Sequence, residues 1–208
     1  MKELIKKIAE LSGKILSLIL PQSLGEQLRA IHTHIYTGYV KGRFARWGKG
    51  SVIAYRAMNL KSASHISVGC NVQISKGAQL TAWPSDNSKD IMIEIGDNCM
   101  LREGCHVTAA NKITIGKNLL TGTNVLITDN SHGTSSREQL ETSPLLRQIH
   151  SKGEVSIGDN VWLGNNVCVM PGVTIGDGAI IGANAVVTSD IPPYSVAAGI
   201  PARIIKTV

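Results

Sequence analysis

Residues 157–192 read IGDNVW LGNNVC VMPGVT IGDGAI IGANAV VTSDIP, which is six hexapeptides with no residue left over. An aliphatic residue opens every unit, an apolar residue fills every fifth position, and Gly, Asn and Asp fill most of the places between. A period of six suits a short strand followed by a corner where Gly or Asn adopts positive φ. Three units would make one triangular coil. The stretch therefore predicts two stacked coils whose first and fifth positions face a narrow core.

The same register extends backwards through the chain. It recovers three more coils, at 68–85, 95–112 and 115–132, and only Thr121 breaks the rule of an aliphatic residue at the first position. We expect the residues left over, 86–94, 113–114 and 133–156, to leave the prism as loops. The longest is too polar to continue the core pattern, and loops of that length in a compact repeat usually serve a function. We interpret 133–156 as a substrate-binding arm.

Composition agrees with an all-β prism of about five coils. Among 208 residues, 43% are apolar, only 4% are aromatic and 21 are glycine, as suits a core too narrow for many rings. The formal charge of +6 is spread along the chain, which favours a solvated surface over nucleic-acid binding. The four cysteines, Cys70, Cys99, Cys105 and Cys168, have no zinc-like spacing. Cys99 and Cys105 fall on fifth positions, so we expect reduced core thiols in a cytoplasmic protein.

The chain begins with an extension, 1–60, that precedes the predicted β-helix domain at 61–192 and a tail at 193–208. Within residues 1–20 the apolar residues follow helical spacing among lysines, which predicts an amphipathic helix that ends at Pro21. The apolar positions are Leu4, Ile8, Leu11, Ile15 and Leu18. Neither a signal peptide nor a transmembrane helix is expected. Two interpretations stay open: the helix packs on a prism, its own or a neighbour's, or it contacts the inner face of a membrane. Residues 22–61 are expected to start as helix and then enter the prism.

His132 is the leading candidate for chemistry. It holds the last outward position of the coil 115–132, where the chain leaves the prism for the long loop. A neutral imidazole at such a place can take a proton from a substrate hydroxyl, although a solvated surface histidine is the plain alternative. His106, on an outer face, and His150, in the arm, are interpreted as packing or solvated residues.

Two segments carry a family resemblance: VLITDNSHG at 125–133 and VWLGNNVCVMPGVTIGDGAIIGANAVVTSDIPPYSVAAGIPARII at 161–205. With the repeat, they resemble hexapeptide-repeat acetyltransferases acting on galactosides, maltose, xenobiotics and bacterial polysaccharides. The segments SHGTSSRE and SPLLRQIHSKGEV are most similar to O-antigen and capsule acetyltransferases. The resemblance implies a left-handed parallel β-helix, a homotrimer, acetyl-CoA as co-substrate, and neither a metal nor a covalent intermediate.

The resemblance also assigns roles to residues. His132 matches the general base. The coenzyme contacts match Asn165, Ala183, Thr188 and Arg203, with Lys206 as a further phosphate contact because Ser189 stands where a coenzyme-binding lysine is common. The acceptor contacts match Trp162, Asp129 and Asn130. Gly104 and Arg102 stand where galactoside enzymes carry asparagines, so a galactoside-type pocket is not expected.

The resulting hypothesis is an enzyme that transfers acetyl from acetyl-CoA to a hydroxyl of a sugar or surface-glycan precursor. A xenobiotic O-acetyltransferase is the nearest alternative, followed by a scaffold without catalysis. A γ-carbonic-anhydrase-like enzyme would need a histidine pair with four residues between its members, which His106, His132 and His150 do not supply.

Overall fold

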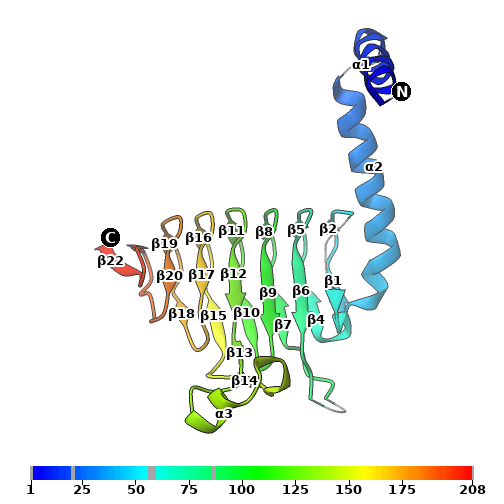
Figure 1. Cartoon of the computed structure of the whole chain (residues 1–208). Helices are drawn as coiled ribbons and strands as arrows, with labels where there is room; N and C mark the ends of the chain where they lie inside the picture. Colours follow the sequence, from blue (N-terminus) through cyan, green and yellow to red (C-terminus); the bar gives the residue numbers. More distant parts are fainter. Residues whose placement is uncertain (1, 20–21, 56–59, 86–87, 208) are drawn as a thin grey trace.

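A computed structural model describes residues 2–19, 22–55, 60–85 and 88–207. Three parallel sheets form the faces of a triangular prism, and the chain visits them in turn (Figure 1). The first sheet contains β1 Arg46–Trp47, β4 Ile66–Val68, β7 Ile93–Ile95, β10 Ile113–Ile115, β15 Val155–Ile157 and β18 Thr174–Ile175. The second contains β2 Val52–Ile53, β5 Gln73–Ile74, β8 Met100–Leu101, β11 Leu120–Thr121, β16 Trp162–Leu163, β19 Ile180–Ile181, β21 Ser195–Ala198 and β22 Arg203–Thr207. The third contains β3 Leu60–Lys61, β6 Gln79–Ala82, β9 His106–Ala109, β12 Leu126–Thr128, β17 Cys168–Val169 and β20 Val186–Val187. Only β22 joins its sheet antiparallel, against β21.

The predicted core positions are confirmed. Every first and fifth position of residues 157–192 is buried, with at most 4% of each residue exposed. Cys99 and Cys105 are buried as expected. Thr121 is fully buried too, and its Oγ1 accepts a hydrogen bond of 2.9 Å from the amide of Arg102. This bond satisfies the one hydroxyl in the aliphatic column, because a buried polar group without a partner would destabilise the core.

Each of the three predicted loops gives residues to a strand of the first sheet. Residues 113–114 do not leave the prism: they belong to β10, where Ile113 is fully buried like Ile115. Residues 93–94 likewise belong to β7. Residues 155–156, expected at the end of the long loop, belong to β15. Strands β4, β7, β10 and β15 therefore start two residues earlier than the hexad register, because alternation turns their first and third residues inward.

The prism also begins earlier than the repeat suggests. Strands β1, β2 and β3 form a first coil in which Trp47, Ile53 and Leu60 pair with Val68, Ile74 and Leu80. Sequence periodicity does not reveal this coil for two reasons. A tryptophan, Trp47, stands at a first position in place of an aliphatic residue, and Leu60 follows Ile53 by seven positions instead of six.

Two of the three prism edges are built from turns that stack on one another. The first edge joins the first sheet to the second, and the second edge joins the second sheet to the third. Asparagines with positive φ occupy both, for example Asn118 (60°), Asn160 (58°) and Asn166 (57°). Their side chains bond along the prism: Asn118 Nδ2 lies 2.9 Å from Asn160 Oδ1, and Asn166 Nδ2 lies 2.9 Å from Asn184 Oδ1. The third edge, between the third sheet and the first, releases both insertions.

Two helices precede the prism. The expected amphipathic helix is α1, Lys2–Ile19, and the expected helical start of 22–61 is α2, Gln22–Val40, followed by the 3-10 turn η1, Lys41–Arg43. The end at Pro21 falls outside the described residues. Val40 is buried against the first coil, and Thr37 Oγ1 accepts from the Ile53 amide at 3.0 Å and donates to its carbonyl at 3.2 Å. None of the helices, as far as they are described, is long and apolar enough to cross a membrane.

Candidate active site

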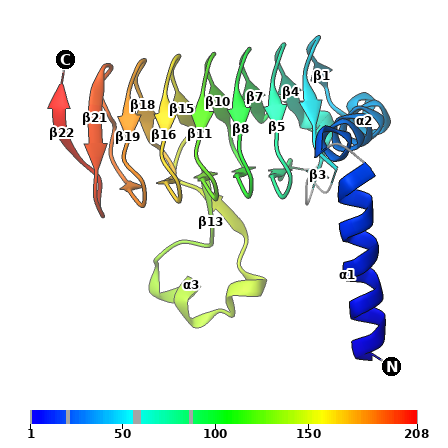
Figure 2. The same cartoon turned by 90° about the horizontal axis from the view of Figure 1, so that it is seen from above.

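The long insertion leaves the third edge as a two-stranded ribbon. Strand β13, Asn130–His132, pairs antiparallel with β14, Ile149–Ser151. Between them lie a short helix, α3 Arg137–Glu141, and a 3-10 turn, η3 Pro144–Leu146. Figure 2 shows this insertion projecting from the middle of the prism. The arm expected from sequence is therefore an ordered hairpin with its own hydrogen bonds.

The ribbon fixes how His132 is presented. His132 lies opposite Ile149 in the ladder and is exposed. Gly133 donates its amide to the Gln148 carbonyl at 2.9 Å, so the next pair, His132 and Ile149, is of the kind whose side chains approach most closely. Their side chains share one face of the ribbon, and His150 lies on the other face because successive residues alternate. His132 thus stands on β13, just beyond the prism strand β12.

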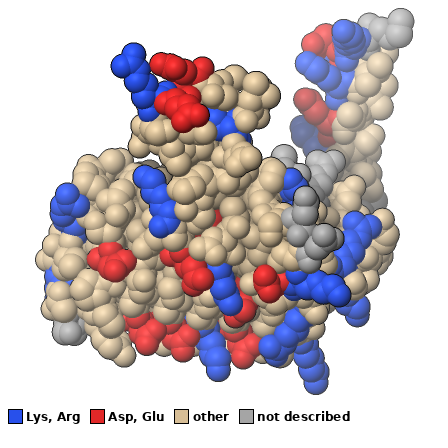
Figure 3. All heavy atoms as spheres, turned by 90° about the horizontal axis from the view of Figure 1, so that it is seen from below, with Lys and Arg blue, Asp and Glu red and all other residues tan. Residues whose placement is uncertain are grey.

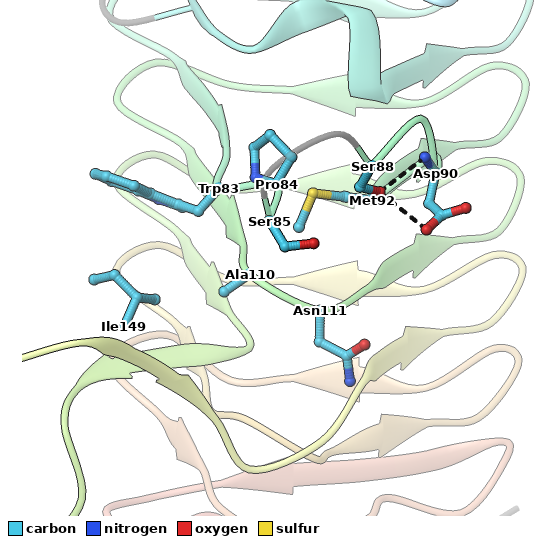
Figure 4. Close-up of a pocket in the computed structure, with 9 residues that line it drawn as sticks. All are labelled: Trp83, Pro84, Ser85, Ser88, Asp90, Met92, Ala110, Asn111 and Ile149. Atoms are coloured by element: carbon cyan, nitrogen blue, oxygen red, sulfur yellow. Dashed lines mark hydrogen bonds between the residues drawn. The ribbon is translucent and has the colours of Figure 1, made fainter.

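A cavity of about 400 Å³ opens beside this pair (Figure 4). Its wall combines an aromatic ring, small polar groups and Ile149 of the ribbon. The lining residues are Trp83, Pro84, Ser85, Ser88, Asp90, Met92, Ala110, Asn111 and Ile149. Because Ile149 both lines the cavity and faces His132, the imidazole lies one side chain away from the cavity wall.

Trp83 lines this cavity, and two contacts hold its ring. Its indole Nε1 donates to Thr108 Oγ1 at 3.1 Å, and the Lys61 ammonium lies 3.2 Å from the ring centroid. About a third of the residue stays exposed, at 37%. Sequence reasoning did not identify Trp83; the only signal was that the residues after the coil 68–85 did not fit the hexad register. A fixed aromatic face beside hydroxyl, carboxylate and amide groups can receive a polar ligand with an apolar face.

Asp129 and Asn130 anchor the start of the ribbon. The fully buried Asp129 carboxylate accepts from the amides of Ala110 at 2.7 Å and Asn111 at 2.8 Å. Asn130 Nδ2 donates to the Thr108 carbonyl at 2.9 Å and to Asp129 Oδ1 at 3.0 Å. Since Ala110 and Asn111 line the cavity, these two side chains act on it through the backbone that they hold.

The residues matched to coenzyme contacts occupy a different edge. Asn165 and Ala183 are exposed at the second edge, where the Asn165 Oδ1 accepts from the Thr123 amide at 2.9 Å. Arg203, exposed in β22, pairs with Ala198, whose Cβ lies against Gly182 of the same edge. Lys206 is exposed farther along β22, opposite Val196. Thr188 alone of this group follows β20 toward the third edge, the edge of His132.

Trp162 stands on a third surface. It is half exposed on β16, in the outer face of the second sheet, and pairs with Leu120 and Ile180. Together with Met100 these residues form the apolar column expected from the register. Within one chain the structure therefore does not bring Trp162 and His132 together, because they lie on different sheets.

The cysteines and the histidine near the core are packing groups. Burial raises the pKa of the Cys105 thiol to about 12 and also raises that of Cys99, so both stay protonated and serve as packing groups. Burial lowers the pKa of His106, whose Nε2 lies 3.3 Å from Thr81 Oγ1. In the described part of the chain, no three His, Cys, Asp or Glu side chains gather in a metal-binding group.

Comparison with known proteins agrees with this architecture. Residues 154–189 match the bacterial transferase hexapeptide (six repeats) family. The chain is 36% identical over 151 residues to the putative lipopolysaccharide biosynthesis O-acetyl transferase WbbJ of Escherichia coli, an alignment that covers 71% of this chain and 74% of WbbJ. It is 34% identical over 121 residues to the galactoside O-acetyltransferase of the same organism, covering 56% of this chain and 54% of that enzyme.

Solved structures share the fold. AntD, an N-acyltransferase from Bacillus cereus solved with dTDP and coenzyme A, superposes with a TM-score of 0.67 at 18% identity, over 82% of this chain and 87% of AntD. The hexapeptide-repeat acetyltransferase VCA0836 from Vibrio cholerae gives 0.57 at 22% identity, over 89% of each chain. With its left-handed parallel β-helix and its similarity to WbbJ over most of both chains, the protein belongs to the bacterial hexapeptide-repeat transferase family.

Proposed function

We propose that this protein is an O-acetyltransferase that moves acetyl from acetyl-CoA to a hydroxyl of a sugar or surface-glycan precursor. The observation that carries the proposal is the juxtaposition of His132, Ile149 and the cavity at the third edge. The names of the two curated relatives, both O-acetyltransferases with carbohydrate roles, support the same chemistry. Residues 133–156 then form the acceptor-binding arm of the 61–192 domain.

His132 is the general base of the proposed reaction. The imidazole takes the proton of the acceptor hydroxyl while that oxygen attacks the thioester carbonyl carbon. The tetrahedral intermediate collapses, its C–S bond breaks, and the coenzyme A thiolate leaves with the proton that the imidazolium returns. An acetyl ester and free coenzyme A result, and the enzyme is unchanged. The exposure of His132 keeps its ring available to an incoming hydroxyl.

The cavity beside the ribbon is the proposed acceptor pocket. Its volume of about 400 Å³ suits a sugar ring, the Trp83 indole offers an apolar surface, and Asp90 and Asn111 offer hydrogen-bonding groups. Asp129 and Asn130 contribute by holding the cavity floor, and direct contact with the acceptor is assigned first to the lining residues. Trp162 completes the acceptor site only if a neighbouring subunit supplies it.

This separation supports a homotrimer. The coenzyme candidates Asn165, Ala183, Arg203 and Lys206 lie near the second edge or on β22, and His132 lies at the third edge. Packing the second edge of one copy against the third edge of the next would bring acetyl-CoA to the imidazole and would complete three sites per trimer. Thr188, already on the side of His132, would then contact the coenzyme from the other wall. A lipid-linked acceptor would also give the N-terminal helices a membrane partner.

The test is His132→Ala, with His150→Ala as the matched control. Both residues lie on the same ribbon, but only His132 shares a face with Ile149. We expect His132→Ala to lower acetyl transfer by roughly 10²-fold or more, the usual size of a general-base effect, with coenzyme binding retained. Coenzyme A release would be followed against a panel of sugars, nucleotide sugars, oligosaccharides and antibiotics. Unchanged turnover in His132→Ala would overturn the assignment, and turnover restricted to antibiotics would favour a xenobiotic enzyme.

A further inference from the structure

Helix α1 presents a broad apolar face that is exposed. Leu4, Ile8, Leu11 and Ile15 recur at helical spacing and are 50–63% exposed, and Ile5 and Leu16 widen the same face. On a helical projection Lys2 and Lys6 border this face on one side, and Lys7 and Lys14 border it on the other, while the two glutamates occupy the middle of the polar face. This arrangement is typical of helices that lie in the plane of a membrane interface.

Helix α2 adds a second apolar surface. Thr37 and Val40 face the first coil, and the opposite side of the helix carries Leu28, Ile31 and Ile35 at 58%, 55% and 65% exposure. Tyr39 continues this outer stripe, and its hydroxyl accepts from Arg43 Nη2 at 3.0 Å, with the guanidinium 4.8 Å from the ring centroid. A tyrosine paired with a cation suits the level of lipid headgroups.

Charge is distributed unequally along the chain. Residues 1–61 contain 11 Lys and Arg against 3 Asp and Glu, and residues 62–208 contain 10 against 12, which gives formal charges of +8 and −2. Around the first coil Lys41, Arg43, Arg46 and Lys49 are all exposed. The moderate total of +6 therefore hides a strongly basic part, made of the two helices and the first coil, that is joined to a slightly acidic remainder.

The apolar and basic features lie at the same end of the molecule. Figures 1 and 2 show α2 beside the end of the prism that begins with β1 and extending past it, with α1 beyond the prism at the other end of α2. Figure 3 shows more Lys and Arg toward this end than toward the end that carries the C-terminus. A flat partner could contact both helices and the cations of the first coil together.

We propose that α1, the outer stripe of α2 and the four cations of the first coil form one docking surface for a bilayer that contains anionic lipid. Burial of the two apolar faces at the headgroup boundary supplies affinity, and the positive charge favours anionic lipid over neutral lipid. The inference goes beyond acetyl transfer and does not depend on it, because docking is measured without turnover.

The experiment is flotation of the full-length protein with vesicles of phosphatidylcholine, with or without phosphatidylglycerol. We expect binding to the anionic vesicles, reduced by roughly tenfold or more in Leu11→Glu and in Ile31→Glu, since each places a charge in a face meant for lipid. Lys41→Glu and Lys49→Glu should each weaken it by at least about fivefold, and added salt should weaken it further.

Matched controls make the same changes on the loop at the third edge. Leu145, 90% exposed, gives Leu145→Glu, and the exposed Lys152 gives Lys152→Glu; neither should alter flotation. Light scattering without vesicles should show the same oligomeric state for every variant. Equal flotation of all variants would overturn the proposal. So would a lower oligomeric state in Leu11→Glu or Ile31→Glu, since it would assign the apolar faces to another copy of the chain.

Discussion

The first and third edges of the prism both contain Asp and Asn, but these residues have different roles at the two edges. At the first edge Asp159 and Asn160 bond to the neighbouring coils: Asp159 Oδ1 lies 2.6 Å from the Lys117 amide, and the Asp159 amide lies 2.7 Å from Asp177 Oδ1. At the third edge the chain departs twice, and Asp129 turns its carboxylate inward to hold a departing ribbon. In the stacked turns, polar groups hydrogen-bond to one another within the fold. Where insertions interrupt the edge, polar groups and a cavity remain available to a ligand.

The difference shows where a repeat protein can acquire chemistry. A stacked turn has neighbours on both sides at strand spacing, so an added atom meets backbone. An insertion has no such constraint beyond its two ends. The candidate base and the cavity accordingly lie where the repeat stops, and the conspicuous repeat at 157–192 forms the wall beside them.

Gly96→Val at the first edge is the severest test of this comparison. A Cβ on Gly96 would lie 2.5 Å from the Gly116 carbonyl oxygen and 2.6 Å from its carbon, which are backbone atoms that cannot yield. We expect destabilisation of at least about 3 kcal/mol, measured by denaturant unfolding. Gly38→Ala, where an added Cβ has nothing within 4 Å, should instead stabilise α2 by up to about 1 kcal/mol. If Gly96→Val folds as well as wild type, the stacked edges are looser than described.

A second test compares the two aspartates. Asp129→Ala would remove the fully buried carboxylate to which the amides of Ala110 and Asn111 donate, at a cost of about 2–4 kcal/mol. Asp159→Ala removes bonds at a partly exposed edge where water can replace the carboxylate, so we expect about 1 kcal/mol. Unfolding by denaturant measures both. Only Asp129→Ala should also reduce acetyl transfer, because the ribbon that carries His132 starts there; equal effects on activity would remove the distinction between the edges.

The sequence predicted the regular parts well for a physical reason. Period six leaves a trace in every coil, so the buried positions, Cys99 and Cys105 among them, follow directly from the register. The first coil was not predicted, because Trp47 and one extra residue between Ile53 and Leu60 remove the period of six there. Residues 113–114 were misplaced because the hexad register carries no signal for where a strand begins.

The site was predictable only in part. The end of the repeat correctly located His132 beside the insertion, while its role stays a proposal. The cavity was not predictable, because Trp83, directly after β6, and Ile149, in the ribbon, meet only after the coils stack. Nor could spacing reveal that Asp129 faces inward, or that Asn165 and His132 occupy different edges of one chain. Such facts depend on tertiary contacts between segments that no local pattern connects.

The mildest test concerns His106, the first residue of β9 on the third sheet. Because burial lowers its pKa below the ordinary 6.5, the folded state binds its proton less readily than the unfolded state. Its contribution to stability is therefore full above about 6.5 and is lost as pH falls through the lower folded pKa. His106→Gln should flatten the decline of unfolding free energy over that acidic range, measured by denaturant titration at several pH values. The substitution should change the stacked edges little, because Thr81 is the only side chain in the described chain seen to bond the His106 ring. An unchanged pH dependence of the unfolding free energy would mean that His106 is not buried in solution.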